Sequence, residues 1–267
     1  MKKAIMAAAV YLLLILPGCT FEKSRLSKTW FYTLTDNSLF PATVSKDHKT
    51  AGTNDPKLTP VNFLSLQKDG QYTCYFTSFE TGTWLYENNY ILLKNKLGGE
   101  RKILVYGTTG KELRIDTDPA NTDDNVEVFE GYTNPFAGTD EDPFGAFNNK
   151  WRIKATAKEG EQGVRKRLLN HFRYWEKYFN WGVKMDIKYL DVRSLPGPLK
   201  LYGNGFELIP VEQWADEWRN YFYDKEDMLI AFNLLHEFFQ NEHIAWPKTD
   251  DKFKQFISAF QQLQQKL

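Results

Sequence analysis

The pair His236-Glu237 is the part of this sequence that comes closest to a catalytic motif. Zinc proteases carry two histidines four residues apart on one helix, with a glutamate after the first, but position 240 is a glutamine. His243 is seven residues from His236 and falls on roughly the same helical face, so a two-histidine metal site is geometrically allowed. A zinc site needs at least a third ligand. We therefore predict no metal.

Other chemical motifs fail in the same way. Gly203-Asn204-Gly205 resembles the start of a dinucleotide-binding loop, but Leu208 occupies the place of the third glycine and no strand–loop–helix unit surrounds it. Neither a glycine-flanked nucleophilic serine nor a phosphate-binding loop is present. Cys74 lies in an aromatic strand, which favours a small buried hydrophobe over a nucleophile. The sequence predicts no enzyme and no cofactor.

Four aromatic residues have the spacing of one face of a helix. The residues are Trp214, Trp218, Tyr221 and Phe222. Such a stripe is most simply part of a core, and the alternative is an interaction surface for a partner.

The N-terminus carries the strongest signal in the chain. Lys2 and Lys3 precede the apolar stretch 4–16, which is shorter than the roughly 20 residues of a membrane helix. This pattern is typical of a signal peptide. The run Leu16-Pro17-Gly18-Cys19 resembles the bacterial lipobox, in which the cysteine is lipidated and becomes the new N-terminus, although Pro17 departs from its usual small or hydroxylated residue.

This resemblance implies a bacterial lipoprotein with a palmitate-bearing lipid on Cys19; the alternative is an ordinary secretory signal with an incidental cysteine. Thr20 follows, where an aspartate would indicate retention at the inner membrane. We expect a lipid-anchored protein of the cell envelope, at the outer membrane of a Gram-negative bacterium.

Composition predicts a folded remainder without a nucleic-acid partner. The chain is 42% hydrophobic and 25% charged, close to the globular average. Basic and acidic residues both number 34, so removing Lys2 and Lys3 with the leader leaves 32 against 34, a net charge of −2. Aromatic residues reach 16%, which fits a β-domain and helix faces, or else a surface that stacks on sugars or fills an apolar pocket.

The first half of the chain has the pattern of short strands separated by tight turns. The expected strands are 29–34, 61–66, 71–76, 82–86, 90–94, 102–106 and 112–116, with turns at Asp69-Gly70, Asn88-Asn89 and Gly98-Gly99. These predict an antiparallel meander, closed or nearly closed into a small barrel. Leu26-Ser27-Lys28-Thr29-Trp30 and the strands that follow resemble the lipocalin-like domain of many bacterial lipoproteins, although Lys28 replaces the signature glycine.

The second half is predicted to be helical. Helices are expected at 161–181, 211–223, 227–243 and 250–267, with one hairpin around Gly203-Asn204-Gly205. The whole chain is thus α+β, with a signal peptide (1–18), a lipidated tether (19–28), a lipocalin-like β-domain (29–116), an acidic linker (117–149) and a mainly helical domain (150–267).

Two functions follow from this organisation. The first is a non-enzymatic interaction module, anchored to the membrane by its lipid and docked to a protein partner in an envelope complex. The alternative is a lipocalin-like carrier that takes a small apolar or sugar-like ligand into its barrel.

Overall fold

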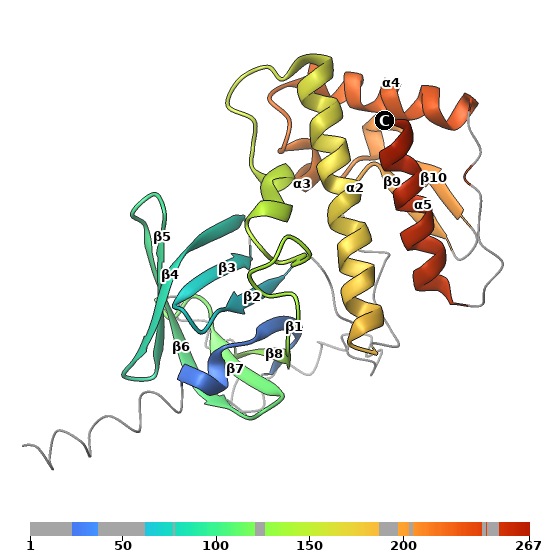
Figure 1. Cartoon of the computed structure of the whole chain (residues 1–267). Coiled ribbons are helices and arrows are strands. Elements are labelled where there is room, and N and C mark those ends of the chain that lie inside the picture. Colours follow the sequence, from blue (N-terminus) through green and yellow to red (C-terminus); the bar gives the residue numbers. More distant parts are fainter. Residues whose placement is uncertain are drawn as a thin grey trace, which may run out of the picture. The chain divides into compact units, whose positions relative to one another are not determined.

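The computed structural model describes residues 23–36, 62–76, 78–120, 126–186, 197–202, 205–241, 244 and 251–267. The chain divides into two compact units, the first with the N-terminal strands and the second with the residues from Asn134 onward. Figure 1 shows a β-barrel in the first and a group of helices in the second.

The first unit is a closed antiparallel barrel in which each strand pairs with the next and β8 pairs with β1. This confirms the predicted α+β class with an antiparallel barrel. The eight strands are β1 (Thr29–Asp36), β2 (Phe63–Leu66), β3 (Gln71–Tyr75), β4 (Phe79–Glu87), β5 (Tyr90–Asn95), β6 (Glu100–Thr108), β7 (Glu112–Asp116) and β8 (Val126–Tyr132).

The closing strand, β8, lies inside the segment that the sequence predicted to be a linker. The usual alternation of apolar and polar residues is not visible in this strand. Val126 and Val128 are buried on one face, and the other face carries both Glu127 and Phe129. The barrel needs this strand, since β7 and β1 both use it as a hydrogen-bonding partner. An acidic composition therefore masked an element of the sheet.

Side-chain alternation identifies the barrel interior. The buried residues Ile91 and Leu93 pair across to Ile103 and Arg101, and Val105 pairs with Ile115. Side chains opposite one another in a sheet share a face. Arg101 therefore belongs to the interior set.

One end of the barrel is filled by tryptophans, and we call it the tryptophan end. Residues 23–26 form a helical turn, and the indole Nε1 of Trp30 donates to the Leu26 carbonyl at 2.8 Å. Trp30 pairs with Gly131, where a Cβ would lie 2.4 Å from the Trp30 ring. Trp84 closes the same end, with its Nε1 donating to the Gln67 carbonyl at 2.9 Å. Residues 23–28, expected to be tether, thus pack onto the barrel.

The second unit contains the helices and a short two-stranded sheet. Its elements are η1 (Phe147–Arg152), α2 (Gly160–Lys184), β9 (Leu199–Tyr202), β10 (Gly205–Leu208), η2 (Val211–Gln213), α3 (Asp216–Arg219), α4 (Lys225–Asn241) and α5 (Lys252–Lys266). Helices α2 and α5 lie side by side (Figure 1), with Phe179 of α2 against Phe256 and Phe260 of α5. Strands β9 and β10 pair antiparallel.

The predicted helix 211–223 is wrong, because two short helices replace it. Trp214 and Ala215 have extended backbone (ψ 136° and 143°) that separates η2 from α3. The Trp214 indole donates instead to the Ile209 carbonyl at 2.8 Å. The spacing of the apolar residues predicted which side chains are buried. It did not predict the backbone conformation between them.

Residues 134–149 form a turn-rich segment held together by its own side chains. Asp142, only 1% exposed, accepts from the Asn134 amide at 2.7 Å and from the Phe144 N–H at 2.9 Å. The buried amides of Asn148 and Asn149 donate to backbone carbonyls of the same segment. The predicted linker is therefore part of the folded structure here.

Candidate functional site

The residues that the sequence singled out for chemistry do not form a cluster. Cys19, His243, Gly203 and Asn204 lie outside the described residues. His236 is exposed on α4, where its ring lies 3.2 Å from the Gln240 amide. Across the described ranges, no group of three metal-ligating side chains comes together, and no helix is both long and apolar enough to cross a membrane.

The four aromatic residues proposed as an interaction surface lie in the core of the second unit. Trp214, Trp218, Tyr221 and Phe222 are 2, 0, 6 and 2% exposed. Trp218 packs edge-on against Tyr221 and Phe222, at ring-centroid distances of 5.9 and 5.3 Å. Their contribution in this chain is to packing.

Charged side chains gather instead inside the barrel, at the end opposite the tryptophans. Glu80 is in phase with the buried Gly82 and Trp84 of β4, and Arg101 is in phase with Ile103 of β6. Their side chains meet as an ion pair at 2.8 Å. Glu127 of β8 pairs with the interior residue Ile115. We call this group, with Tyr72 and Cys74, the charged end.

Tyr72 and Cys74 bring two further polar groups to the charged end. Burial raises the pKa of both side chains far above their usual range, and the negative charge of Glu80 adds to the effect. The Cys74 thiol therefore stays protonated and is a poor nucleophile. The Tyr72 hydroxyl is buried without a hydrogen-bond partner among the described residues.

Glu127 is the third ionisable side chain in the interior. Burial raises the pKa of its carboxyl, while hydrogen bonds from the Thr117 hydroxyl and backbone N–H lower it. Arg101 also favours the ionised form, and Asp116 opposes it. The Oε2 atom is buried and accepts no hydrogen bond from the part of the chain that the structure describes.

The charged end therefore offers hydrogen-bonding atoms inside the barrel that are unpaired within the described ranges. Buried polar groups in proteins are almost always paired, and an exception calls for a physical explanation. Glu127 Oε2 is an acceptor, and the Tyr72 hydroxyl can donate or accept. Since Glu80 and Arg101 offset one another, an ionised Glu127 leaves the site negative. It suits a ligand with hydroxyl or amine donors.

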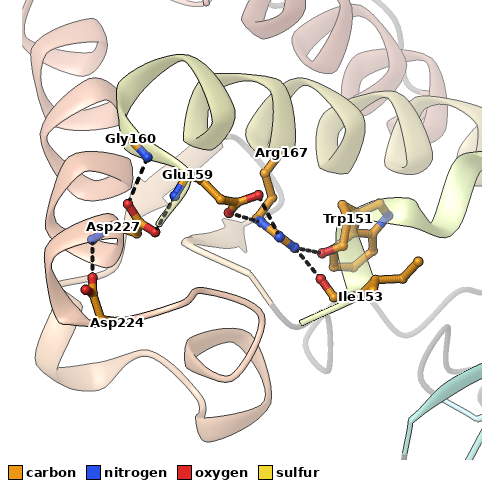
Figure 2. Close-up of polar contacts among 7 residues, drawn as sticks. All are labelled: Trp151, Ile153, Glu159, Gly160, Arg167, Asp224 and Asp227. Atoms are coloured by element: carbon orange, nitrogen blue, oxygen red, sulfur yellow. Dashed lines mark hydrogen bonds and ion pairs between the residues drawn. The ribbon is translucent and has the colours of Figure 1, made fainter. Parts of the chain in front are cut away.

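The second unit contains a buried ion pair of a different kind (Figure 2). Arg167 donates to both carboxylate oxygens of Glu159, at 2.7 and 2.9 Å. Its Nη1 also donates to the carbonyls of Trp151 and Ile153, at 2.6 and 2.9 Å. This bidentate pair ties the start of α2 to the end of η1 and is structural.

Asp227 completes this network at the start of α2. Its carboxylate accepts from the backbone N–H groups of Glu159 and Gly160, at 3.0 and 3.1 Å (Figure 2). These N–H groups precede the first full turn of α2, where intrahelical acceptors are missing. Asp224 does the same for α4, because its Oδ1 accepts from the Asp227 N–H at 3.1 Å. Each carboxylate anchors a helix end.

His171 is the buried titratable side chain of the second unit. Its ring lies 4.6 Å from both Trp151 and Trp218, and Trp175 donates to its Nε2 at 3.2 Å. Burial lowers the pKa of His171 well below its usual value, and the charge of Arg152 lowers it further. The imidazole is therefore neutral and acts as a core residue.

The sequence carries a signal for the charged end in the periodicity of its strands. Glu80 and Arg101 fall in step with buried positions of their strands, Glu80-x-Gly82-x-Trp84 and Arg101-x-Ile103-x-Val105. Charges in the interior phase of a strand are unusual. Glu127 lies in the acidic segment 117–149 that the sequence predicted to be a linker, so its strand phase was not recognised.

Comparison with known proteins gives no match: no family model fits the chain, and no curated protein or solved structure is significantly similar to it.

Proposed function

We propose that this protein is a lipid-anchored envelope protein whose barrel binds a small hydrogen-bonding ligand at its charged end. One observation carries the proposal: Tyr72 and Glu127 present buried polar atoms without partners among the described residues, beside an ion pair inside the barrel. Leaving such groups unpaired costs about 1–3 kcal/mol each. A ligand that pairs them would recover this cost.

The class of ligand follows from the lining. For a carrier, the sequence predicted an apolar or a sugar-like ligand. The charged end favours a sugar-like ligand, because hydroxyl groups can pair with both Tyr72 and Glu127. Glu127 also favours a ligand amine. Anionic ligands are disfavoured by the negative charge of the group.

The lipocalin-like character and the anchor are parts of the same proposal. Support for the first is a closed eight-stranded barrel with Trp30 near the start of β1 and a helical turn before it. Support for the anchor is the run Leu16-Pro17-Gly18-Cys19 after an apolar leader. Together they describe a carrier held at a bacterial outer membrane.

Native mass spectrometry of the protein released gently from its host membranes tests the proposal. We expect the mass of a lipidated chain beginning at Cys19, with an added small molecule. Tyr72→Phe and Glu127→Gln should each lose the added mass or weaken its retention by about tenfold, the equivalent of 1.4 kcal/mol.

Two conservative variants serve as controls. Glu130 lies on β8 in the outward phase, since it alternates with Glu127, Phe129 and Gly131. The Tyr86 hydroxyl is exposed and donates to Asn89 at 3.2 Å, far along β4 from Glu80. Glu130→Gln and Tyr86→Phe should keep the ligand. Equal loss in all four variants, or no added mass in the wild type, would contradict the proposal.

The interaction module remains a second candidate, favoured by exposed apolar side chains in the second unit. Phe147 is 53% exposed and Ile153 is 55% exposed, at the two ends of η1. Capture of whole polypeptides with the lipidated protein, lost in Phe147→Ser with Ile153→Ser, would favour this function over the carrier.

A further inference from the structure

We propose that the tryptophan end of the barrel is a membrane-facing surface, which seats on an anionic bilayer and turns the charged end away from it. This inference rests on the proposed lipidation of Cys19. It goes beyond the proposed function because it assigns an orientation and a contact surface to the barrel.

The chain between the proposed lipid on Cys19 and the barrel is short. Cys19 precedes Lys23, the first residue of the helical turn at the tryptophan end, by four residues. A fully extended chain covers at most about 3.6 Å per residue, or about 14 Å in all. The tryptophan end would therefore be held beside the bilayer surface.

The helical turn is itself fixed to this end, so the tether leads directly into the barrel. The Lys23 ammonium lies 5.4 Å from the centre of the Trp84 ring. Leu26 is 1% exposed and receives the Trp30 indole hydrogen bond. The Lys28 ammonium donates to the Gly110 carbonyl in the turn between β6 and β7.

Charge is the second argument. Exposed cations come from three segments at the tryptophan end: Arg25 in the helical turn, Lys68 between β2 and β3, and Lys111 between β6 and β7. Among the described residues of this end, the acidic side chains are Asp69 and Glu87, which are exposed, and Glu112 and Glu130, which are half-buried. With Lys23 and Lys28 there are five basic residues against these four acidic ones, so the end is net positive. Basic residues near an anionic leaflet are attracted to its surface.

The opposite end lacks this excess of positive charge. Outside the barrel, Glu100, Asp116 and Asp118 are matched by Lys94, Lys96 and Lys102, and inside it Glu80 and Glu127 face Arg101. An anionic bilayer therefore attracts this end less than the tryptophan end, so the charge asymmetry favours the proposed orientation.

Apolar exposure is the third argument. Leu85 is 49% exposed and Tyr106 is 39% exposed, each two residues from the strand end that meets the tryptophan end. Leu85 pairs with Leu92, and Tyr90 pairs with Leu104, on the same outer face. Tyrosine and leucine beside lysine and arginine suit the membrane–water interface. Leu97 is exposed in the β5–β6 turn at the other end, so the experiment must test both ends.

Fluorescence quenching by headgroup-labelled lipids distinguishes the two ends. Lys68 and Lys96 are a matched pair, because both are exposed lysines in hairpin turns, one at each end. In a Cys74→Ser background, Lys68→Cys or Lys96→Cys carries a fluorophore on the lipidated full chain, in vesicles of phosphatidylcholine and phosphatidylglycerol. We expect several-fold stronger quenching at position 68.

A glycine–serine insertion after Thr20 tests the surface itself. If the basic and apolar face seats the barrel, quenching at position 68 stays ahead of position 96 despite the longer tether, and adding salt removes the difference. If the preference disappears with the insertion at low salt, the tether alone orients the barrel and the surface is not a docking site.

Failure of this inference is distinguishable from failure of the proposed function. Equal quenching at the two positions, or stronger quenching at position 96, overturns the orientation when mass spectrometry shows an intact lipid. A chain without lipid in its own host refutes the anchor, and with it the premise of this inference, while leaving the ligand test of Tyr72 and Glu127 unaffected.

Discussion

Two partly buried ion pairs, one in each unit, differ in what surrounds them. In the helical unit, Arg167 reaches both oxygens of Glu159 and two carbonyls, so each partner is satisfied. In the barrel, the pair of Arg101 and Glu80 lies in a group whose Tyr72 hydroxyl and Glu127 Oε2 have no partner in the described ranges. The first arrangement stabilises the fold, and the second leaves polar atoms that the proposed ligand would pair.

Burial of charge therefore does not by itself mark a functional site. A bidentate pair with its remaining donors used fixes one geometry. A group with leftover donors and acceptors costs free energy in the unliganded protein and calls for an explanation, such as a bound ligand, ion or water. Substitutions that act on only one of the two ion pairs can distinguish the roles of these pairs.

The largest effect is expected from Arg167→Met. This change leaves Glu159 without its cation and two backbone carbonyls without donors, so the free energy of unfolding should fall by about 3 kcal/mol. Urea denaturation measures it. Lys166→Met is the matched control, because Lys166 is exposed one residue away, and its effect should stay within about 0.5 kcal/mol. A loss below about 1 kcal/mol at Arg167 would remove the contrast between the units.

Gly131→Ala should come next, and it acts on the barrel. A Cβ at this position would lie 2.4 and 2.7 Å from two atoms of the Trp30 ring. The ring and strand must shift, which costs about 1–3 kcal/mol. Gly107→Ala in β6 is the control, since a Cβ there meets nothing within 4 Å. Equal urea midpoints for the two variants would show that Trp30 is not tightly packed.

His171 should make the free energy of unfolding depend on pH. Its pKa is lowered in the folded state, so below pH about 6.5 the unfolded chain binds a proton that the folded chain does not. The free energy of unfolding therefore falls as pH falls below 6.5, by up to about 1.4 kcal/mol per pH unit. His171→Gln should flatten this slope relative to the wild type, whereas His236→Gln should not.

The smallest effect, and the one of opposite sign, is expected from Glu127→Gln. The pKa of Glu127 is raised in the folded state, so the folded chain retains a proton that the unfolded chain has lost, and stability decreases as pH rises above about 4.5. The variant should be more stable than the wild type at neutral pH, by less than about 1 kcal/mol because the carboxyl is partly accessible to water.

Glu130→Gln is the control for this variant and should leave stability unchanged. A Glu127→Gln protein that is less stable at neutral pH would mean that the carboxylate is structural. That outcome would make the barrel group resemble the Arg167 network.

Strand periodicity and turn residues predicted seven of the eight strands, because Asp69-Gly70 and Asn88-Asn89 specify tight turns. Both asparagines have the left-handed backbone (φ 50° and 65°) that such a turn requires. Helices α2, α4 and α5 followed from their apolar spacing. Asp251, one residue after the predicted helix start at 250, accepts from the N–H groups of Phe253 and Lys254 and starts α5.

The charged end could not be predicted, because which strands face one another is a property of the closed sheet. Glu80 and Arg101 meet across β5, and Glu127 joins the interior only because β8 pairs with β7 and β1 in the closed sheet. The same closure depends on a strand that an acidic composition concealed. Residue types alone therefore predicted a barrel, but they did not predict which side chains meet in its interior.

The single described cysteine gives the barrel a built-in reporter. Cys74 is 0% exposed, and its thiol is reached only when neighbouring strands separate. When opening is fast relative to the chemistry, the rate at which an alkylating reagent modifies such a thiol reflects the population of the open form. The rate of Cys74 alkylation thus reports the fraction of molecules in which the charged end is open, without a substitution in the chain.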